Sequence, residues 1–195
     1  MNVMPPSIFT IGHSTRPIDA FLELLAESRI ECVVDVRRLP GSRRFPQYNA
    51  EAFEESLASQ DIDYWHLEPL CGRRSKAELE SSIADAFWRN ASFGRYAAYA
   101  RSTAFENGLE ALLNRAHEQR CALMCSEAVW WRCHRRIIAD HLLARGVSVF
   151  HIMGLGNVVA AELTRGAILD NGNVIYPVPT DDQRATDKTC RGDRS

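Results

Sequence analysis

The sequence predicts an α/β fold in which a mostly parallel sheet of about five strands carries helices on both faces. Short apolar runs such as Cys32–Val36 contain at most one charged residue, which is typical of strands buried on both faces. Between these runs lie segments with apolar residues at helical spacing, for example Phe21, Leu24 and Leu25. Strands that alternate with helices predict parallel pairing, because each helix returns the chain across the sheet.

The apolar runs predict strands at residues 7–12, 32–36, 62–67, 120–125 and 147–152, and helical spacing predicts helices at 17–28, from about 50 onward, 75–90, 103–119 and 131–145. Pro17 suits the first turn of its helix, and Asn49 can cap the helix that begins near Ala50. The aromatic stretch 91–101 is expected to pack over a site or over the edge of the sheet.

The C-terminal part predicts smaller elements. Residues 157–164 are interpreted as a short helix. Ala167–Leu169 and Val174–Tyr176 flank an Asn-Gly pair that suits a tight turn, so they predict a small hairpin. Residues 179–195 are polar and charged without an apolar period and are expected to be disordered. No linker divides residues 1–178, which are therefore expected to form a single domain.

Composition excludes several classes of protein. The 195 residues are 46% hydrophobic and 25% charged with a net charge of −2, so there is no global attraction to nucleic acid or anionic membranes. No apolar run approaches the ~20 residues of a membrane helix, and Met1–Pro6 does not resemble a signal peptide. These features predict a cytoplasmic protein with no membrane partner. The six cysteines are scattered, so no disulfide framework is expected.

The stretch Leu123–Arg135 concentrates reactive side chains: two thiols, a carboxylate, an imidazole and two guanidinium groups. Cys125–Glu127 lies where a predicted strand gives way to a helix expected to begin at Trp131. Ligands of open α/β sheets bind at the carboxyl ends of strands. The candidate site is therefore placed here.

Each of these side chains has a functional and a structural interpretation. Cys125 is a nucleophile if His134, Arg135 and the helix N-terminus make its surroundings electropositive, or else a buried core cysteine. Glu127 is a general base or a metal ligand, or it caps the helix or pairs with an arginine. His134 transfers a proton, ligates a metal with Cys133, or is simply half-buried and hydrogen-bonded. Because paired cysteine knuckles are absent, we predict no metal and no cofactor.

Two further groups end neighbouring strands. Gly12 allows close approach of another backbone, His13 is suited to proton transfer, and Ser14 can donate to a phosphate. Asp35 and Arg37 are two residues apart, so in an extended chain their side chains leave on the same side.

Arginine supplies 21 of the 23 basic residues, although codon bias in a GC-rich genome would also account for that total. Arg132, Arg135 and Arg136 crowd the start of the predicted helix, where the helix dipole disfavours cations. An anion bound at the helix N-terminus would explain the crowding. The alternative is that the carboxylates of Glu127 and Asp35 neutralise these arginines.

The spacing of these segments resembles the domain-of-unknown-function 488 family. The matching segments are Thr10–Ser14, Asp35–Arg37 with Pro40 and Ser42, Tyr64–Leu70, Tyr99–Phe105, Leu123–Glu127 with Cys133–Arg135, and Val149–Ile152. The resemblance implies a fold and candidate residues but no reaction. Two departures are Cys71-Gly72, where a glycine pair is expected, and Trp130-Trp131, where a more polar spacer is expected.

The favoured hypothesis is an enzyme with an anion-accepting cleft that acts on a phosphorylated or nucleotide-type substrate. In it Arg37, Arg43 and Arg135 bind the anion, and His13 or His134 transfers a proton. A deep pocket with buried arginines would favour this hypothesis.

The alternative hypothesis is a nucleic-acid-binding or processing module that uses the arginine-rich loop 37–44. Exposed Trp130, Phe45 or Tyr48 beside arginines would favour it, because bases stack on such rings. A purely structural partner protein would leave the ionisable strand ends unexplained.

Overall fold

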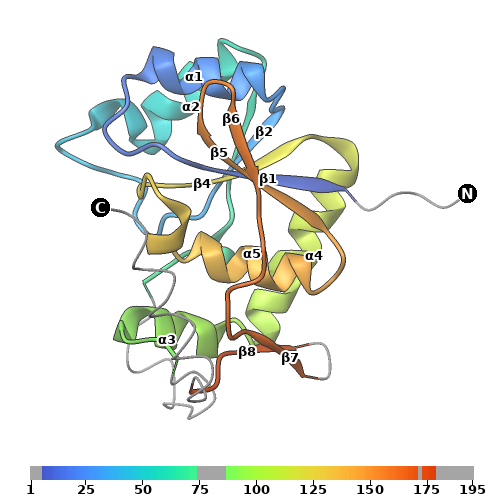
Figure 1. The fold of residues 1–195 in the computed structure, drawn as a ribbon. Coiled ribbons are helices and arrows are strands. Elements are labelled where there is room, and N and C mark those ends of the chain that lie inside the picture. The colour runs from blue at the N-terminus through green and yellow to red at the C-terminus, as the bar shows by residue number, and fades with distance from the viewer. Residues whose placement is uncertain (1–5, 74–86, 171–172, 179–195) are drawn as a thin grey trace, which may run out of the picture.

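A computed structural model describes residues 6–73, 87–170 and 173–178 (Figure 1). The predicted helix at 75–90 lies almost wholly outside the described residues. The predicted disordered tail, 179–195, and the Asn-Gly pair of the hairpin also lie outside them.

The core of the fold is a six-stranded sheet in the order β3-β2-β4-β1-β5-β6. Its strands are β1 (Ser7–Gly12), β2 (Cys32–Asp35), β3 (Asp63–His66), β4 (Cys121–Cys125), β5 (Ser148–Gly154) and β6 (Asn157–Ala160). The first five pair in parallel, and β6 is an antiparallel edge strand next to β5. The predicted α/β class, its parallel sheet and its five expected strands are confirmed.

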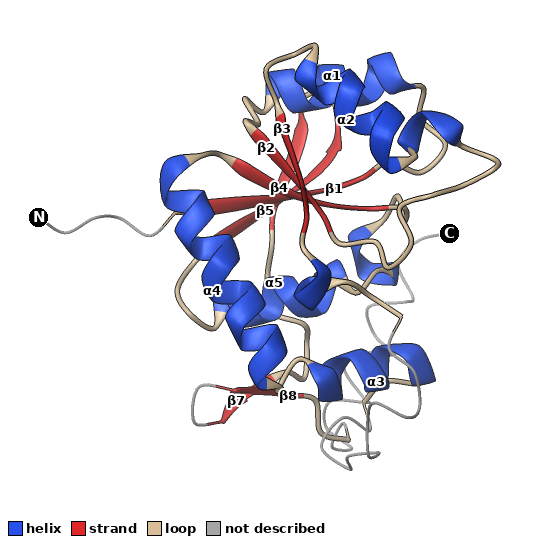
Figure 2. Ribbon diagram, turned by 180° about the vertical axis from the view of Figure 1, so that it is seen from behind, coloured by secondary structure: helices blue, strands red, loops and turns tan. Residues whose placement is uncertain are grey.

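Helices cover both faces of the sheet (Figures 1 and 2). On one face lie α1 (Ile18–Glu27) and α2 (Ala50–Ala58), and on the other lie α4 (Thr103–Glu118) and α5 (Arg135–Leu143), with α3 (Ala91–Tyr99) beyond them. Single turns of 3-10 helix are η1 (Pro46–Tyr48), η2 (Glu68–Leu70) and η5 (Trp130–Arg132). The predicted hairpin is present as β7 (Ile168–Asp170) and β8 (Asn173–Ile175).

Alternation along the strands divides the core into two layers. On β4, Ala122 and Met124 join the cluster under α1 and α2, whereas Leu123 and Cys125 join the cluster that contains α4 and α5. Burying one Leu or Phe side chain contributes ~1.5–3 kcal/mol, so both clusters hold the layers firmly. The layer assignment also puts the Cys125 side chain on the same side of the sheet as α5.

Two sequence predictions are wrong. Residues 157–164 are not a short helix, because residues 157–160 form β6 and pair with β5. The chain turns back at Gly156, whose φ of +63° suits glycine, and the β-branched Val158 and Val159 favour an extended strand.

The last helix begins at Arg135 and not at Trp131. Cys133 has extended backbone angles, φ −126° and ψ 148°, so it separates the turn η5 from α5. The thiol of Cys133 therefore projects from a non-helical residue just before the helix.

Within the described ranges, no helix is long and apolar enough to cross a membrane.

Candidate functional site

The carboxyl ends of four parallel strands bring the predicted residues to one edge of the sheet. Gly12 is the register partner of Cys125, and Asp35 is the partner of both Met124 and His66. Beyond the strands, the backbone N–H of His13 donates to the carbonyl of Cys125 at 3.0 Å. Ligand sites of open α/β proteins form at this edge, as the sequence analysis assumed.

Gly12 is required by the loop that follows β4. A Cβ at this position would lie 1.8 Å from the backbone carbonyl oxygen of Glu127. The same carbonyl accepts a hydrogen bond of 2.5 Å from Nη2 of Arg135. The carboxylate of Glu127 is exposed and forms no ion pair with a described residue. Glu127 therefore contacts Arg135 through its backbone, and the expected charge pairing between their side chains is absent.

Asp35 and Arg37 form a buried ion pair. Nε and Nη2 of Arg37 donate to the Asp35 carboxylate, with an Nη2–Oδ2 distance of 2.6 Å, and Tyr64 Oη donates to Oδ2 at 2.8 Å. Nη1 of Arg37 donates to the carbonyl of Tyr48 at 2.8 Å. The prediction that the side chains of Asp35 and Arg37 leave the chain on the same side is confirmed. The charge of Arg37 is already balanced by protein groups.

His13 is buried and stacked on the ring of Tyr48, with centroids 4.1 Å apart. Its Nδ1 lies 2.9 Å from the carbonyl oxygen of Ser14, so Nδ1 carries the proton and Nε2 faces Nη1 of Arg37 at 3.5 Å. Burial, and then the charge of Arg37, lower the pKa of His13 to about 4. His13 is therefore neutral near pH 7 and offers an acceptor at Nε2.

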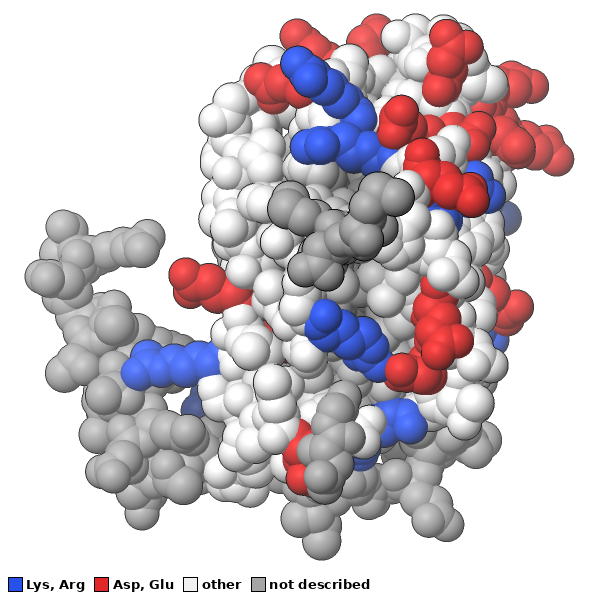
Figure 3. Space-filling view, turned by 90° about the vertical axis from the view of Figure 1, so that its right-hand side faces the viewer, with Lys and Arg blue, Asp and Glu red and all other residues white. Residues whose placement is uncertain are grey.

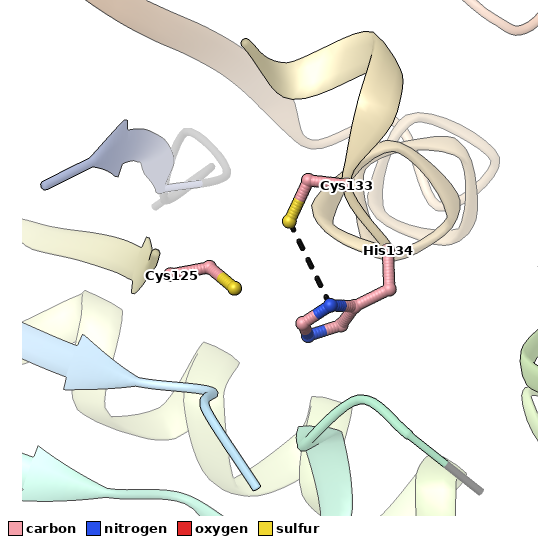
Figure 4. Close-up of side chains that lie close together, drawn as sticks. All are labelled: Cys125, Cys133 and His134. Carbon is pink, nitrogen blue, oxygen red and sulfur yellow. Dashed lines mark hydrogen bonds between the residues drawn. The ribbon is translucent and has the colours of Figure 1, made fainter. Parts of the chain in front are cut away.

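Three polar side chains surround one sulfur, that of Cys133, and two of them, Cys125 and His134, are drawn in Figure 4. Nε of Arg135 lies 3.3 Å from this sulfur, and Nδ1 of His134 lies 3.6 Å from it. The sulfur of Cys125, at the end of β4, lies within 4.8 Å of it (Figure 4). A sulfur surrounded by a guanidinium, an imidazole N–H and a thiol is in the environment that stabilises a thiolate.

The pKa values of the two thiols are shifted in opposite directions. Burial opposes ionisation of Cys133, but the hydrogen bond from Cys125 and the charge of Arg135 outweigh it and lower the pKa of Cys133 to about 6. The hydrogen bond to Cys133, and then burial, raise the pKa of Cys125 to about 12. The pair therefore shares one proton near neutral pH, and that proton lies on Cys125.

Arg135 is a buried cation without a carboxylate partner among the described residues. Its side chain is 1% exposed, and none of the ion pairs between described residues includes it. Its hydrogen bonds run from Nε to the sulfur of Cys133 and from Nη2 to the Glu127 carbonyl, and none runs from Nη1 within the described ranges. The thiolate of Cys133 is thus the anion that balances its charge.

Glycine and aromatic neighbours fix the position of His134. A Cβ on Gly72 would lie 2.7 Å from Nδ1 of His134, and the ring of Tyr96 packs edge-on against the imidazole at 4.8 Å. Tyr96 lies on α3, so the aromatic stretch does pack over the site. Nε2 of His134 is buried and has no hydrogen-bond partner among the described residues.

Cys125, Cys133 and His134 are also the described residues whose donor atoms could meet at a metal ion, since these atoms all lie within 4.8 Å of one another. Two thiolates and one imidazole are ligands that zinc accepts. However, a dication with two thiolates would leave the buried charge of Arg135 unbalanced, whereas a single thiolate neutralises it. Charge balance therefore favours a thiol–thiolate pair of Cys125 and Cys133 over a metal site.

Other predicted residues lie further from this sulfur. Arg43 is exposed on the loop between β2 and η1. Ser14 is half-buried with a φ of +52°, and its backbone N–H donates to the Ser126 carbonyl at 3.0 Å.

From the sequence, Tyr48 is expected only as a ring on which bases could stack, Gly72 only as part of a departure from the family, and Cys133 only as a metal ligand. The adjacency of Cys133, His134 and Arg135 was a local signal for the sulfur. Tyr48 and Gly72 come from distant loops and had no such signal.

The protein is an α/β protein whose candidate site lies at a strand–loop–helix junction. One thiol ends β4, the second lies just before α5, and a buried ion pair lies at the same edge of the sheet. The family model described as "Domain of unknown function DUF488" matches residues 17–142, and the chain belongs to this family. No curated protein and no solved structure matches the chain.

Proposed function

We propose that the protein is a thiolate-dependent enzyme that acts on a small anionic substrate, of phosphorylated or nucleotide type. The observation that supports this proposal is the convergence of Arg135, His134 and Cys125 on the sulfur of Cys133. Structural cysteines need no such arrangement, because a buried neutral thiol packs as a small apolar group. A cluster of donors around one sulfur supports a nucleophile.

In this proposal Cys133 forms the bond to the electrophilic atom of the substrate. Cys125 and Nδ1 of His134 hold the sulfur ionised, and Nε2 of His134 is the acceptor or carrier of a proton. Nη1 of Arg135, which donates to no described residue, is directed to an anionic group of the substrate. The sequence analysis assigned the nucleophile to Cys125, whereas the donor geometry favours Cys133.

The arginine and aromatic positions favour a small-molecule enzyme over a nucleic-acid-binding module. Arg37, Arg135 and Tyr48 are buried, so they are not available to a nucleic-acid backbone or base. On the face that Figure 3 shows, acidic side chains gather at the top, which is the level of α1 and α2 in Figure 1. The described residues form no continuous basic patch on this face. A phosphate backbone needs such a patch.

Alkylation with paired reagents tests the proposal. Iodoacetate is anionic and iodoacetamide is neutral, so their rates at Cys133 report both the thiolate and the nearby cation. We expect Cys133 to be the fastest-reacting cysteine, to prefer iodoacetate, and to be protected by inorganic phosphate. Arg135→Lys should keep part of the preference and Arg135→Met should lose it, because only lysine retains a charge.

The exposed Arg132→Met is the matched control and should react like the unmodified protein. The proposal fails if Cys133 reacts no faster than Cys121, a buried core thiol, or if phosphate and Arg135→Met leave the rates unchanged.

A further inference from the structure

The described residues include two pairs of facing cysteines, and the pairs differ in their surroundings. Cys32 and Cys121 are register partners on β2 and β4, and both are fully buried in the sheet. Cys125 and Cys133 lie at the carboxyl edge of the sheet and are 7% and 3% exposed. Figure 4 shows the Cys125 side chain directed into the space between Cys133 and His134. Within the described ranges, only this second pair has a guanidinium hydrogen-bonded to one of its sulfurs.

We propose that Cys125 and Cys133 form a reversible oxidation site, at which a hydroperoxide oxidises Cys133 and Cys125 then closes a disulfide. The inference rests on the proposed function in one respect, namely that Cys133 is the ionised sulfur. It goes beyond that function by giving Cys125 a chemical role of its own.

The first step is attack of the Cys133 thiolate on the distal oxygen of the hydroperoxide. The S–O bond forms as the O–O bond breaks, so Cys133 becomes a sulfenic acid, and the departing alkoxide or hydroxide takes a proton from solvent to become an alcohol or water. Nη1 of Arg135 is placed to stabilise the departing oxyanion by a charge-assisted hydrogen bond. Oxidation of cysteine begins at thiolates in this way.

In the second step Cys125 attacks the sulfenic sulfur. The S–S bond forms as the S–O bond breaks, and the departing hydroxide takes the proton of the Cys125 thiol to leave as water. Two molecules of a low-molecular-weight thiol reverse the reaction by exchange and are themselves oxidised to a disulfide. Electrons balance with a hydroperoxide and a thiol as the only co-reactants, and the one proton that the oxidation takes from solvent returns to it on reduction.

The backbone allows this closure without unwinding a helix. Cys125 is the last residue of β4, and Cys133 precedes α5 with extended backbone angles. The sulfurs already lie within 4.8 Å of each other. Disulfide formation also removes the negative charge that balances Arg135, which is 1% exposed. The oxidised state is therefore penalised, and we expect thiols to reduce it readily.

Peptide mapping of the full-length protein after exposure to hydrogen peroxide tests the inference. The reduced protein is first treated with a chelator, then oxidised, and its remaining thiols are blocked. We expect the peptides that contain Cys125 and Cys133 to be joined with the loss of two hydrogen atoms, and to separate again with dithiothreitol. Cys32 and Cys121 should stay reduced, because both are fully buried in the sheet and neither sulfur accepts a hydrogen bond from a guanidinium among the described residues.

Single variants separate the two steps. Cys125→Ser should stop at a sulfenic acid that dimedone traps at Cys133, and Cys133→Ser should give neither product. Cys121→Ser is the control and should still form the disulfide. Mapping of the unmodified protein keeps the test valid even if a variant fails to fold.

The inference is overturned if the Cys125–Cys133 disulfide is absent from the oxidised protein, or if Cys32 and Cys121 oxidise equally fast. Failure of the disulfide while Cys133 still reacts preferentially with iodoacetate would overturn this inference alone. Failure of both reactions would overturn the proposed function as well.

Discussion

The ion pair between Asp35 and Arg37 permits a stability prediction that is independent of the thiol chemistry. Asp35 is fully buried, and its carboxylate accepts hydrogen bonds from the guanidinium and backbone N–H of Arg37 and from the hydroxyl of Tyr64. Asp35→Asn keeps the shape of the side chain but removes its charge. The buried guanidinium then has no counterion.

Removing one partner of a buried ion pair costs ~3–5 kcal/mol, because the other charge stays buried. For a chain of this size the melting temperature should therefore fall by about 6–20 °C. Urea unfolding followed by tryptophan fluorescence gives the free energy directly. Asp35→Asn combined with Arg37→Met should cost less than the sum of the single variants, because the second change removes the unpaired charge.

The control is Asp63, which pairs with Arg115 at 3.4 Å on the surface with side chains 57% and 37% exposed. Asp63→Asn should cost no more than ~1 kcal/mol, because water screens exposed pairs. If Asp35→Asn destabilises the protein no more than Asp63→Asn, the account of the buried pair is wrong.

Two further predictions concern packing and pH. Gly72→Ala should displace the imidazole of His134, because the new Cβ would lie 2.7 Å from Nδ1. We expect the free energy of unfolding in urea to fall by ~1–3 kcal/mol and the alkylation of Cys133 to become slower. Unchanged alkylation would contradict the role of Gly72. Burial lowers the pKa of His141 to about 3 and that of His151 to about 4. The folded state therefore binds fewer protons than the unfolded state, and the free energy of unfolding should fall as the pH drops from ~6.5 toward 4. Replacing both histidines with glutamine should reduce the slope of unfolding free energy against pH by up to ~1.4 kcal/mol per pH unit for each, and an equal slope would refute this.

The sequence was sufficient for the main sheet because apolar runs such as Cys32–Val36 report burial directly. The same reasoning failed at residues 157–164, where the exposed Val158 and Val159 provide no burial signal and the turn at Gly156 decides the structure. The strand-end location of the site followed from topology, because the ends of parallel strands meet at one edge.

The identity of the ionised sulfur could not be predicted in the same way. His134 and Arg135 are local to Cys133, but the third donor, Cys125, reaches it only because β4 ends opposite the start of α5. The stacking of His13 on Tyr48 likewise joins segments that are distant in sequence. Such contacts depend on tertiary packing and leave no periodic signal in the chain.

The central claim is that Cys133 is a thiolate at neutral pH. The difference in ultraviolet absorbance between the unmodified protein and Cys133→Ser, recorded as a function of pH, measures that ionisation directly. The account predicts one thiolate that appears with a midpoint near pH 6, so that at pH 7 the sulfur is ionised about 30-fold more than an ordinary cysteine. A midpoint at ~8.5 or above, the range of an unperturbed thiol, would contradict it.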